Sequence, residues 1–289
     1  MFHTMLKNYA ARIEVFLTNL PWDEATMGQS MRYSLVGGGK RIRPVLALAA
    51  AEAVGGDAET VLPAACSLEL IHTYSLIHDD LPAMDNDDYR RGRLSNHKVF
   101  GEGNAILAGD GLLTYAFEIL AQPLSAVSLE RQLRVIQEVA QAAGPAGMVG
   151  GQVLDLAAEG KTLTLEEVEQ IHRLKTGAML TVSARLGGIL GGGTEEQIQA
   201  LTRYAQALGL AFQIKDDILD LEGDSKTLGK PVKSDLKQEK STYPSLLGIT
   251  GAKEQLALQV QEAHKALTVF NKSTDFLYLL ADYIAERKS

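Results

Sequence analysis

The chain has 289 residues, of which 46% are hydrophobic and 22% are charged, a composition typical of a globular protein with a sizeable core. Its net charge of −8 argues against nucleic acid as a partner, and its single cysteine excludes an internal disulfide, which fits a reducing compartment. It shows neither an apolar run of about 18 residues nor a signal peptide, so we expect a cytoplasmic protein without a membrane span.

Helical patterns follow one another along the whole chain. Apolar residues recur with a helical period, whereas strand-like alternation is hard to find. The ranges with this pattern are Met5–Thr18, Glu24–Leu35, Val45–Val54, Leu62–His78, Asn104–Ala121, Leu129–Ala143, Tyr243–Phe270 and Thr274–Glu286. We therefore predict an all-α fold, organised as one large helical bundle in a single domain over residues 1–289.

Capping and turn residues between the helices support the same prediction. Two capping boxes, at 164–167 and 194–197, each open a further helix, and the second of these could run to Leu221. Glycines at 187–188 and 191–193 are expected to separate the two helices as caps and turns. The expected loops are 37–39, 85–95 and 223–240.

Two groups of aspartates follow long apolar stretches that indicate helices. They are Asp79, Asp80 and Asp85 in the first group, and Asp216, Asp217 and Asp220 in the second. Aspartate is a poor helix residue and like charges repel, so closely spaced carboxylates need a cation between them. Oxygen-only ligands favour Mg²⁺, which proteins usually share with phosphate oxygens. These residues therefore predict a site where Mg²⁺ binds a phosphorylated substrate.

The spacing within each group differs. Asp216 and Asp220 stand one helical turn apart on one face, with Gln213 on the same side. Asp79 and Asp85 are six positions apart with a proline between them, so the chain must loop out to bring the two carboxylates together. A solvated helix face and a solvated loop are the plain alternatives. The apolar neighbours of the second group, and the presence of two groups, favour the metal site.

Basic residues recur beside glycines or at helix ends, where they suit phosphate. Lys40, Arg41 and Arg43 follow three glycines and precede Pro44, the expected start of a helix. The spacing of a nucleotide P-loop is not met, because Ser34 stands where that motif needs its first glycine. Further basic positions beside glycine or near a helix end are Lys175, Lys230 and Lys240. Each of these lysines has the alternative role of a solvated surface charge.

Two Glu-x-x-His pairs offer a rival metal site. Glu69 with His72, and Glu169 with His172, have the spacing found in di-iron sites of ferritin-like bundles. Such a site needs two further glutamates from other helices, and it leaves both aspartate groups without a role. We therefore favour the magnesium site.

Five motifs in a fixed order resemble those of the trans-polyprenyl diphosphate synthases, and the resemblance covers almost the whole chain. They are Gly38–Pro44, His78–Asp85 with Arg90–Gly92 behind it, Gly150–Asp155, Lys175–Gly177 and Phe212–Asp220. Within that family the chain is most similar to the bacterial members that make farnesyl diphosphate. Two positions depart from the family pattern: Leu94–Ser95 replaces the expected Pro-Thr, and Glu239 precedes Lys240 where glycine is usual.

The resemblance implies an all-α fold around a central cavity, usually a homodimer, that works with several Mg²⁺ ions. The implied magnesium ligands are Asp79, Asp85 and Asp216, while Asp80, Asp217 and Asp220 are implied to bind the metal through water molecules or to support its direct ligands. The residues implied for isopentenyl diphosphate are Lys40, Arg43, His72 and Arg91. Those implied for dimethylallyl or geranyl diphosphate, the allylic substrate, are Arg90, Lys175, Thr176, Gln213, Lys230 and Lys240. Glu69 and Asp155 are expected to contact these binding residues without contacting the substrates themselves.

The implied reaction is a prenyl transfer. Mg²⁺ and basic side chains stabilise the charge on the departing pyrophosphate, the double bond of isopentenyl diphosphate attacks the allylic cation, and a proton is lost. The expected catalytic residues are Asp79, Asp80, Asp85, Asp216, Asp217 and Lys175. The expected product is farnesyl diphosphate, with geranylgeranyl diphosphate as the alternative. A non-catalytic helical subunit is a third hypothesis, but it would be expected to lose an aspartate group, and this chain keeps both.

One position bears on product length. Tyr74 precedes Asp79 by five residues, which places it about 7.5 Å down the helix from the metal site, where the tail of a growing prenyl chain would run. The resemblance implies that a bulky ring here, next to Ser75, stops growth at the fifteen-carbon product. A core tyrosine without such a role is the alternative.

Overall fold

The predicted all-α fold is confirmed by the computed structural model, which describes residues 1–222, 241–270 and 274–287. The expected loop at 223–240, with Lys230 and Lys240, lies outside the described residues. The described elements are α1 (Phe2–Thr18), α2 (Thr26–Leu35), α3 (Ile42–Ala53), α4 (Ala58–Asp79), β1 (Tyr89–Arg90), β2 (Arg93–Leu94), α5 (Asn96–Phe100), α6 (Glu102–Ala121), α7 (Leu129–Ala143), α8 (Met148–Ala158), α9 (Leu165–His172), η1 (Arg173–Gly177), α10 (Ala178–Leu190), α11 (Glu195–Glu222), α14 (Tyr243–Ala266), η2 (Leu267–Val269) and α15 (Asp275–Glu286).

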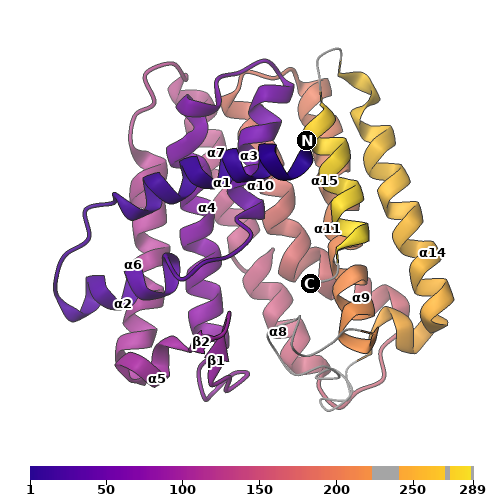
Figure 1. Cartoon of the computed structure of the whole chain (residues 1–289), viewed down its shortest axis with the longest axis horizontal. Coiled ribbons are helices and arrows are strands. Elements are labelled where there is room, and N and C mark those ends of the chain that lie inside the picture. Colours follow the sequence, from indigo (N-terminus) through magenta and orange to yellow (C-terminus); the bar gives the residue numbers. More distant parts are fainter. Residues whose placement is uncertain (223–240, 271–273, 288–289) are drawn as a thin grey trace.

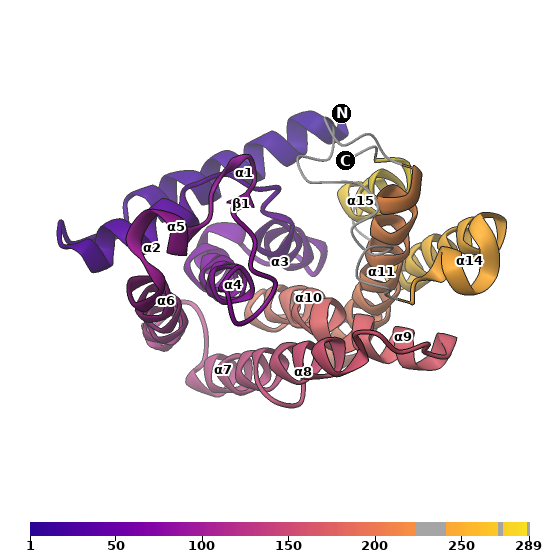
Figure 2. The ribbon, with the colours of Figure 1, turned by 90° about the horizontal axis from the view of Figure 1, so that it is seen from below.

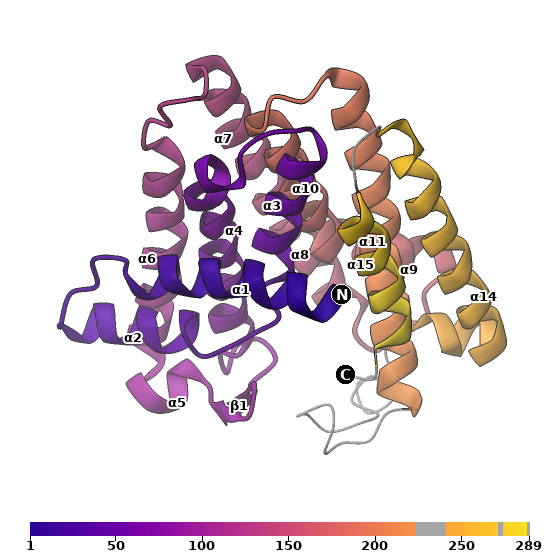
Figure 3. The same cartoon turned by 45° about the horizontal axis from the view of Figure 1, so that its top comes forward.

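Most helices run along one direction, while α1 and α2 cross them at a steep angle (Figure 1). Viewed from below in Figure 2, α3, α4 and α10 lie in the middle, with α1, α6, α7, α8 and α11 around them. α14 lies outside α11, and the N-terminus lies beside α15 (Figure 3). The rings of Phe2 and Phe276 stack there with centroids 5.4 Å apart, so the first helix packs against the last described one.

Close packing of small residues forms the middle of the bundle. Every residue of α3 from Pro44 to Ala51 is buried. Gly187 and Gly188 lie inside α10 and do not separate two helices, so the prediction for them was wrong. A Cβ atom on Gly187 would clash with the carbonyl oxygen of Ala47, which explains the glycine: it lets α10 approach α3. The predicted break does occur at Gly191, directly after α10.

α4 runs through this core and ends at the first aspartate group. Asp57 caps its start by accepting hydrogen bonds from the backbone N–H groups of Glu59 and Thr60. Among the described residues, α4 alone is long and apolar enough to cross a membrane, and 67% of the apolar window is buried inside the protein. A helix packed between α3 and α6 in a core meets the same criterion, so this finding is weak support for a span.

Three features do not follow from the sequence pattern. The short strands β1 and β2 pair antiparallel inside the expected loop at 85–95. The pattern does not predict α8, which contains Gly150 and Gly151; a Cβ on Gly151 would clash with the backbone of Lys175, so this glycine brings α8 close to η1. The third feature is η1 itself, a π-helical turn that joins α9 to α10, and such turns are frequent at functional sites.

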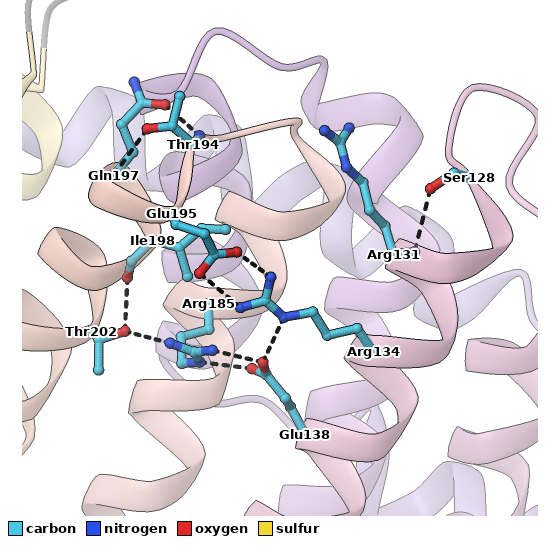
Figure 4. Close-up of polar contacts among 10 residues, drawn as sticks. All are labelled: Ser128, Arg131, Arg134, Glu138, Arg185, Thr194, Glu195, Gln197, Ile198 and Thr202. Carbon is cyan, nitrogen blue, oxygen red and sulfur yellow. Dashed lines mark hydrogen bonds and ion pairs between the residues drawn. The ribbon is translucent and has the colours of Figure 1, made fainter.

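An ion network joins α7, α10 and the start of α11, at the end of α11 remote from its aspartates (Figure 4). Glu138 accepts hydrogen bonds from two nitrogens of Arg185, at 2.7 and 2.6 Å, and from Arg134 at 3.1 Å. Arg134 also pairs with Glu195, and Arg185 donates to Thr202 at 2.8 Å. Because Glu138 and Arg185 are mostly buried, this network holds three helices in a fixed register.

Candidate active site

The two aspartate groups lie at the same end of the bundle, because α4 and α11 both end there (Figure 1). Asp79 is the last residue of α4. The chain then loops back as predicted: the backbone N–H of Asp85 donates to the carbonyl oxygen of Asp79 at 2.9 Å. Burial raises the pKa of the Asp79 carboxyl to about 6; Lys175 opposes this rise and the nearby Asp85 adds to it. The Asp79 carboxylate therefore lacks a full counter-charge.

Asp80 is buried and paired with Arg90. The Nε atom of Arg90 donates to Asp80 at 2.9 Å, a second Arg90 nitrogen donates to the same oxygen, and that nitrogen also reaches Asp87 at 3.2 Å. Arg90 was expected on the allylic diphosphate, and in the structure its charge is engaged within the first aspartate group. Asp80 thus fixes the arginine beside Asp79.

The second aspartate group lines a cavity of about 230 Å³ between α8, α9 and α11. Its polar lining comprises Asp155, His172, Lys175, Gln213, Asp216, Asp217, Asp220, Ser241 and Thr242. Asp217 accepts a hydrogen bond from the backbone N–H of Tyr243 at 2.9 Å and lies 3.5 Å from the Nε2 atom of His172. Its carboxylate therefore anchors the first residue of α14 to α11. The sequence predicted that Asp217 supports the metal ligands without being one of them, and that role stays a prediction.

Asp216 is paired with a residue that sequence reasoning missed. Arg287, directly after α15, donates to Asp216 at 2.7 Å and to the carbonyl oxygen of Phe212 at 3.1 Å. Its guanidinium carbon lies 4.2 Å from the centre of the Phe212 ring. No spacing rule connects Arg287 with the aspartates, because only the packing of α15 against α11 brings them together.

Lys175 lies between the two aspartate groups. Its Nζ atom donates to Asp155 at 2.7 Å, and its positive charge opposes the raised pKa of Asp79. Thr176, the next residue of η1, lines a different cavity from Lys175. The π-helical turn therefore separates two cavities, and Thr176 stands on the side away from its expected allylic neighbours.

That other cavity is basic and has a volume of about 550 Å³. It is lined by the four residues expected on isopentenyl diphosphate, which are Lys40, Arg43, His72 and Arg91. Burial lowers the pKa of Arg43 to about 10, although Glu69 opposes this, and burial likewise lowers the pKa of Arg91. Burial, and next the charge of Arg43, lower the pKa of His72 well below its usual range, so its imidazole is neutral. The cavity thus combines two arginines whose charge is disfavoured by burial with a neutral hydrogen-bonding ring.

The donor set at the acidic end suits Mg²⁺. The described residues contain no group of three His, Cys, Asp or Glu side chains close enough to hold a metal by themselves. Mg²⁺ is typically bound by one or two carboxylates together with substrate phosphates and water, so the carboxylates of Asp79 and Asp85 fit an ion that arrives with a diphosphate. Burial, with a smaller contribution from the charge of Asp85, raises the pKa of Asp79, and a cation bound beside this carboxylate would supply the charge that ionisation lacks there.

The rival di-iron site gains no support. Glu69 binds Arg41 at 2.7 Å, and Glu169 accepts from the hydroxyl of Tyr243 at 3.0 Å and pairs with Arg173 at 2.8 Å. Among residues 1–222, 241–270 and 274–287, neither Glu-x-x-His pair meets the further carboxylates that a di-iron site requires. Both glutamates are engaged with donors from other segments.

Tyr74 and Ser75 lie on α4 below the first aspartate group. The Tyr74 side chain is buried, and its ring meets that of His78 edge-on with centroids 5.7 Å apart. The hydroxyl of Ser75 donates to the carbonyl oxygen of His72 at 2.9 Å.

The chain is similar to proteins of one known family, in sequence and in structure. The polyprenyl synthetase family model matches residues 24–277. The chain belongs to the polyprenyl synthetase family. It is 50% identical to the farnesyl diphosphate synthase of Geobacillus stearothermophilus, with 98% of this chain and 93% of the relative covered. It is 49% identical to the geranylgeranyl diphosphate synthase of Cyanophora paradoxa, with 90% and 87% covered. An FPP/GFPP synthase structure from Zymomonas mobilis matches this polyprenyl synthetase with a TM-score of 0.87 at 39% identity, covering 98% of each chain.

Proposed function

We propose that this polyprenyl synthetase condenses isopentenyl diphosphate with dimethylallyl or geranyl diphosphate to form farnesyl diphosphate. The observation that carries this proposal is that two cavities of opposite character lie on either side of η1: one is lined by carboxylates, which would need a metal to take an anion, and the other is lined by basic residues, which would not. Two diphosphates that differ in their need for metal match these two sites. The 50% identity with a farnesyl diphosphate synthase over nearly the full chain supports the choice of product.

The acidic side would take the allylic diphosphate. Asp79, Asp85 and Asp216 would hold Mg²⁺, which when bound supplies positive charge that stabilises the departing pyrophosphate. Lys175 adds a fixed cation on the same side, because Asp155 holds its Nζ atom in place. Lys230 and Lys240, which lie outside the described residues, remain predicted ligands of this diphosphate.

Asp216 would offer Mg²⁺ its Oδ2 atom, because its Oδ1 atom already accepts from Arg287. The arginine supplies positive charge beside this carboxylate, and metal bound with the diphosphate would add to it. Gln213, one turn earlier on α11, lines the same cavity and is placed to donate to a diphosphate oxygen.

The basic cavity would take isopentenyl diphosphate. Arginines whose pKa burial has lowered gain most from an anion that restores their counter-charge, and Arg43 and Arg91 are both in that state. The neutral ring of His72 offers a hydrogen bond without adding charge. Carbon–carbon bond formation then needs no nucleophilic side chain, because the double bond of this substrate attacks the allylic cation. Apolar surroundings of the prenyl chain would keep out water that could quench that cation.

We propose that Tyr74 limits the length of the product. The metal-binding carboxylate of Asp79 fixes the diphosphate end of the prenyl chain, and the chain extends along α4 toward Tyr74, about 7.5 Å away by helical rise. A buried phenol ring at this depth stops growth at fifteen carbons. Geranylgeranyl diphosphate, the product named for the relative from Cyanophora paradoxa, is the second candidate.

We also propose a homodimer in the cytoplasm. Large apolar side chains are exposed on three consecutive helices, and they are Ile106 and Leu107 on α6, Leu129 and Leu133 on α7, and Val149 and Val153 on α8. Exposed apolar side chains on three successive helices suit a protein interface, and a second copy of this chain is the occupant we propose. The buried single cysteine suits a reducing compartment.

One assay tests the proposed reaction. The enzyme is incubated with labelled isopentenyl diphosphate and, in turn, dimethylallyl, geranyl or farnesyl diphosphate, and the products are separated by chain length. We expect farnesyl diphosphate from the first two primers, little product from the third, and no turnover in excess EDTA. Full turnover in EDTA would refute the metal-assisted mechanism, and geranylgeranyl diphosphate as the main product would favour the second candidate.

A further inference from the structure

Arg41 stands between two proposed ligands of isopentenyl diphosphate, yet its side chain is engaged within the protein. The guanidinium is fully buried, and each of its three nitrogens donates at 2.7 Å: Nε to Glu14, Nη1 to Glu69 and Nη2 to the carbonyl oxygen of Leu35. These acceptors lie on α1, on α4 and at the end of α2. One side chain thus joins three helices at the edge of the basic cavity.

The backbone at this position explains why such an anchor is needed. Arg41 has φ 52°, a left-handed conformation that is uncommon for a residue with a side chain, and it directly precedes α3. Gly38 and Gly39, just before it, also have positive φ, at 96° and 137°. The glycines adopt this conformation at little cost, so the backbone strain falls on Arg41, and its three hydrogen bonds hold the backbone path in place. That path sets where Lys40 and Arg43, the neighbours of Arg41, enter the cavity.

Glu69 links Arg41 to a second segment that borders the cavity, the turn between β1 and β2. Its side chain is 2% exposed, it accepts from Arg41, and its carboxylate lies 4.0 Å from a nitrogen of Arg91. Arg91 in turn donates to the carbonyl oxygen of Gly38. A buried carboxylate needs its cations close by, so Glu69 draws together the loop before α3 and the turn between β1 and β2. Both segments carry residues proposed to bind isopentenyl diphosphate.

We propose that Arg41, held by Glu69, is a positioning residue that fixes the geometry of the isopentenyl diphosphate pocket without being one of its ligands. This inference rests on the pocket assigned under the proposed function, and it gives a role to the Glu69 of the first Glu-x-x-His pair. The prediction is selective: disturbing Arg41 alters the binding of isopentenyl diphosphate and spares the allylic substrate, whose site is formed by α4, η1 and α11.

The first test is Arg41→Lys. Lysine keeps the positive charge that attracts a diphosphate, but it lacks the planar fork that reaches three acceptors at once. Misplacing binding groups by about 1 Å costs up to about 100-fold, so we expect the KM for isopentenyl diphosphate to rise roughly tenfold or more. The KM for geranyl diphosphate should change by less than about twofold. Calorimetric titration with isopentenyl diphosphate alone should show a matching rise in Kd.

The variant Glu69→Gln keeps the test decisive if Arg41→Lys fails to fold. Glu69→Gln keeps the shape and one acceptor oxygen, and it should show the same selective rise in KM. The double variant should be no worse than the worse single variant, because both changes disrupt one interaction. Arg185→Lys is the matched control: this arginine makes a similar fork to Glu138 but borders neither cavity, so its loss should lower Tm without changing either KM.

The outcomes separate this inference from the pocket on which it rests. If Arg91→Ala leaves the KM for isopentenyl diphosphate unchanged, the pocket itself is wrongly assigned. If Arg91→Ala raises that KM, but Arg41→Lys and Glu69→Gln only lower Tm or change both KM values equally, Arg41 has a structural role and the positioning role is refuted.

Discussion

Replacing Asp79 by asparagine should stabilise the metal-free protein while it abolishes turnover. Burial and the nearby Asp85 raise the pKa of Asp79 from 3.8 to about 6, although Lys175 opposes the rise. Because one pKa unit is worth about 1.4 kcal/mol, ionising this carboxyl costs the folded state up to about 3 kcal/mol relative to the unfolded chain. Asn has nearly the same shape and carries no charge, so it removes that cost.

The pH dependence of this gain follows from the direction of the shift. The pKa is higher in the folded than in the unfolded chain, so the cost is absent below about pH 4, grows between pH 4 and 6, and is complete above pH 6. Asp79→Asn should therefore gain roughly 1–3 kcal/mol at pH 8, where the lower value allows for solvent screening, and about nothing at pH 4. At about 2 °C per kcal/mol for a chain of this size, Tm should rise by roughly 2–6 °C at pH 8.

Thermal unfolding in EDTA at pH 4, 6 and 8 measures this effect. Addition of Mg²⁺ with inorganic pyrophosphate should then raise the Tm of the wild type more than that of the variant, because the variant has lost a metal ligand. Asp110→Asn, at a mostly exposed carboxylate on α6, is the control and should shift Tm by no more than about 1 °C. A variant no more stable than the wild type at pH 8, or equally stabilised at pH 4 and pH 8, would refute the reasoning.

Three further predictions address product length, the pocket and the fold. Tyr74→Ala should make room for a longer prenyl chain along α4 and shift the product of the labelled-substrate assay to geranylgeranyl diphosphate or longer. A variant that still stops at farnesyl diphosphate would show that Tyr74 does not limit the length of the product. Gly39→Ala should raise the KM for isopentenyl diphosphate about tenfold in steady-state kinetics, because a Cβ would lie 2.7 Å from the Arg91 guanidinium and strain a backbone at φ 137°; an unchanged KM would contradict this. Glu138→Ala should destabilise the protein by roughly 2–3 kcal/mol in urea unfolding at pH 7, with both KM values unchanged. Burial raises the pKa of Glu138, but its hydrogen bonds to Arg185 outweigh this and lower it, so the loss should shrink as the pH falls below about 4.5, and a loss that persists there would count against the ion network.

Local periodicity determined most of the fold. Helix α7 begins and ends at the predicted residues, and α4 and α11 differ from prediction by a few residues at their ends. α7 buries a regular apolar stripe, α4 is apolar enough to be buried on all sides from Ala64 to Ile71, and both begin with side-chain caps. These are properties of neighbouring residues in the chain. The sequence also determined that the chain loops back between Asp79 and Asp85, because the proline between them disrupts the helix.

Predictions of helix ends from glycines were confirmed at some positions and wrong at others. Gly191 ends α10 as expected, whereas Gly187 lies inside that helix and serves its contact with α3. The same ambiguity hid α8, in which Gly151 makes room for η1. A glycine that ends a helix and one that lets two helices approach are identical in the sequence, and only the identity of the neighbouring helix distinguishes them.

At the candidate site, the sequence determined which residues carry charge, and the tertiary structure decided which charges meet. Motif order was sufficient to predict that Lys40, Arg43, His72 and Arg91 share a pocket, and all four line one cavity. Motif order gave no indication that Arg287 pairs with Asp216, or that Arg41 binds Glu69 while its neighbours line the cavity. Contacts between distant segments depend on how whole helices pack, and that packing is a property of the complete core, which no local spacing encodes.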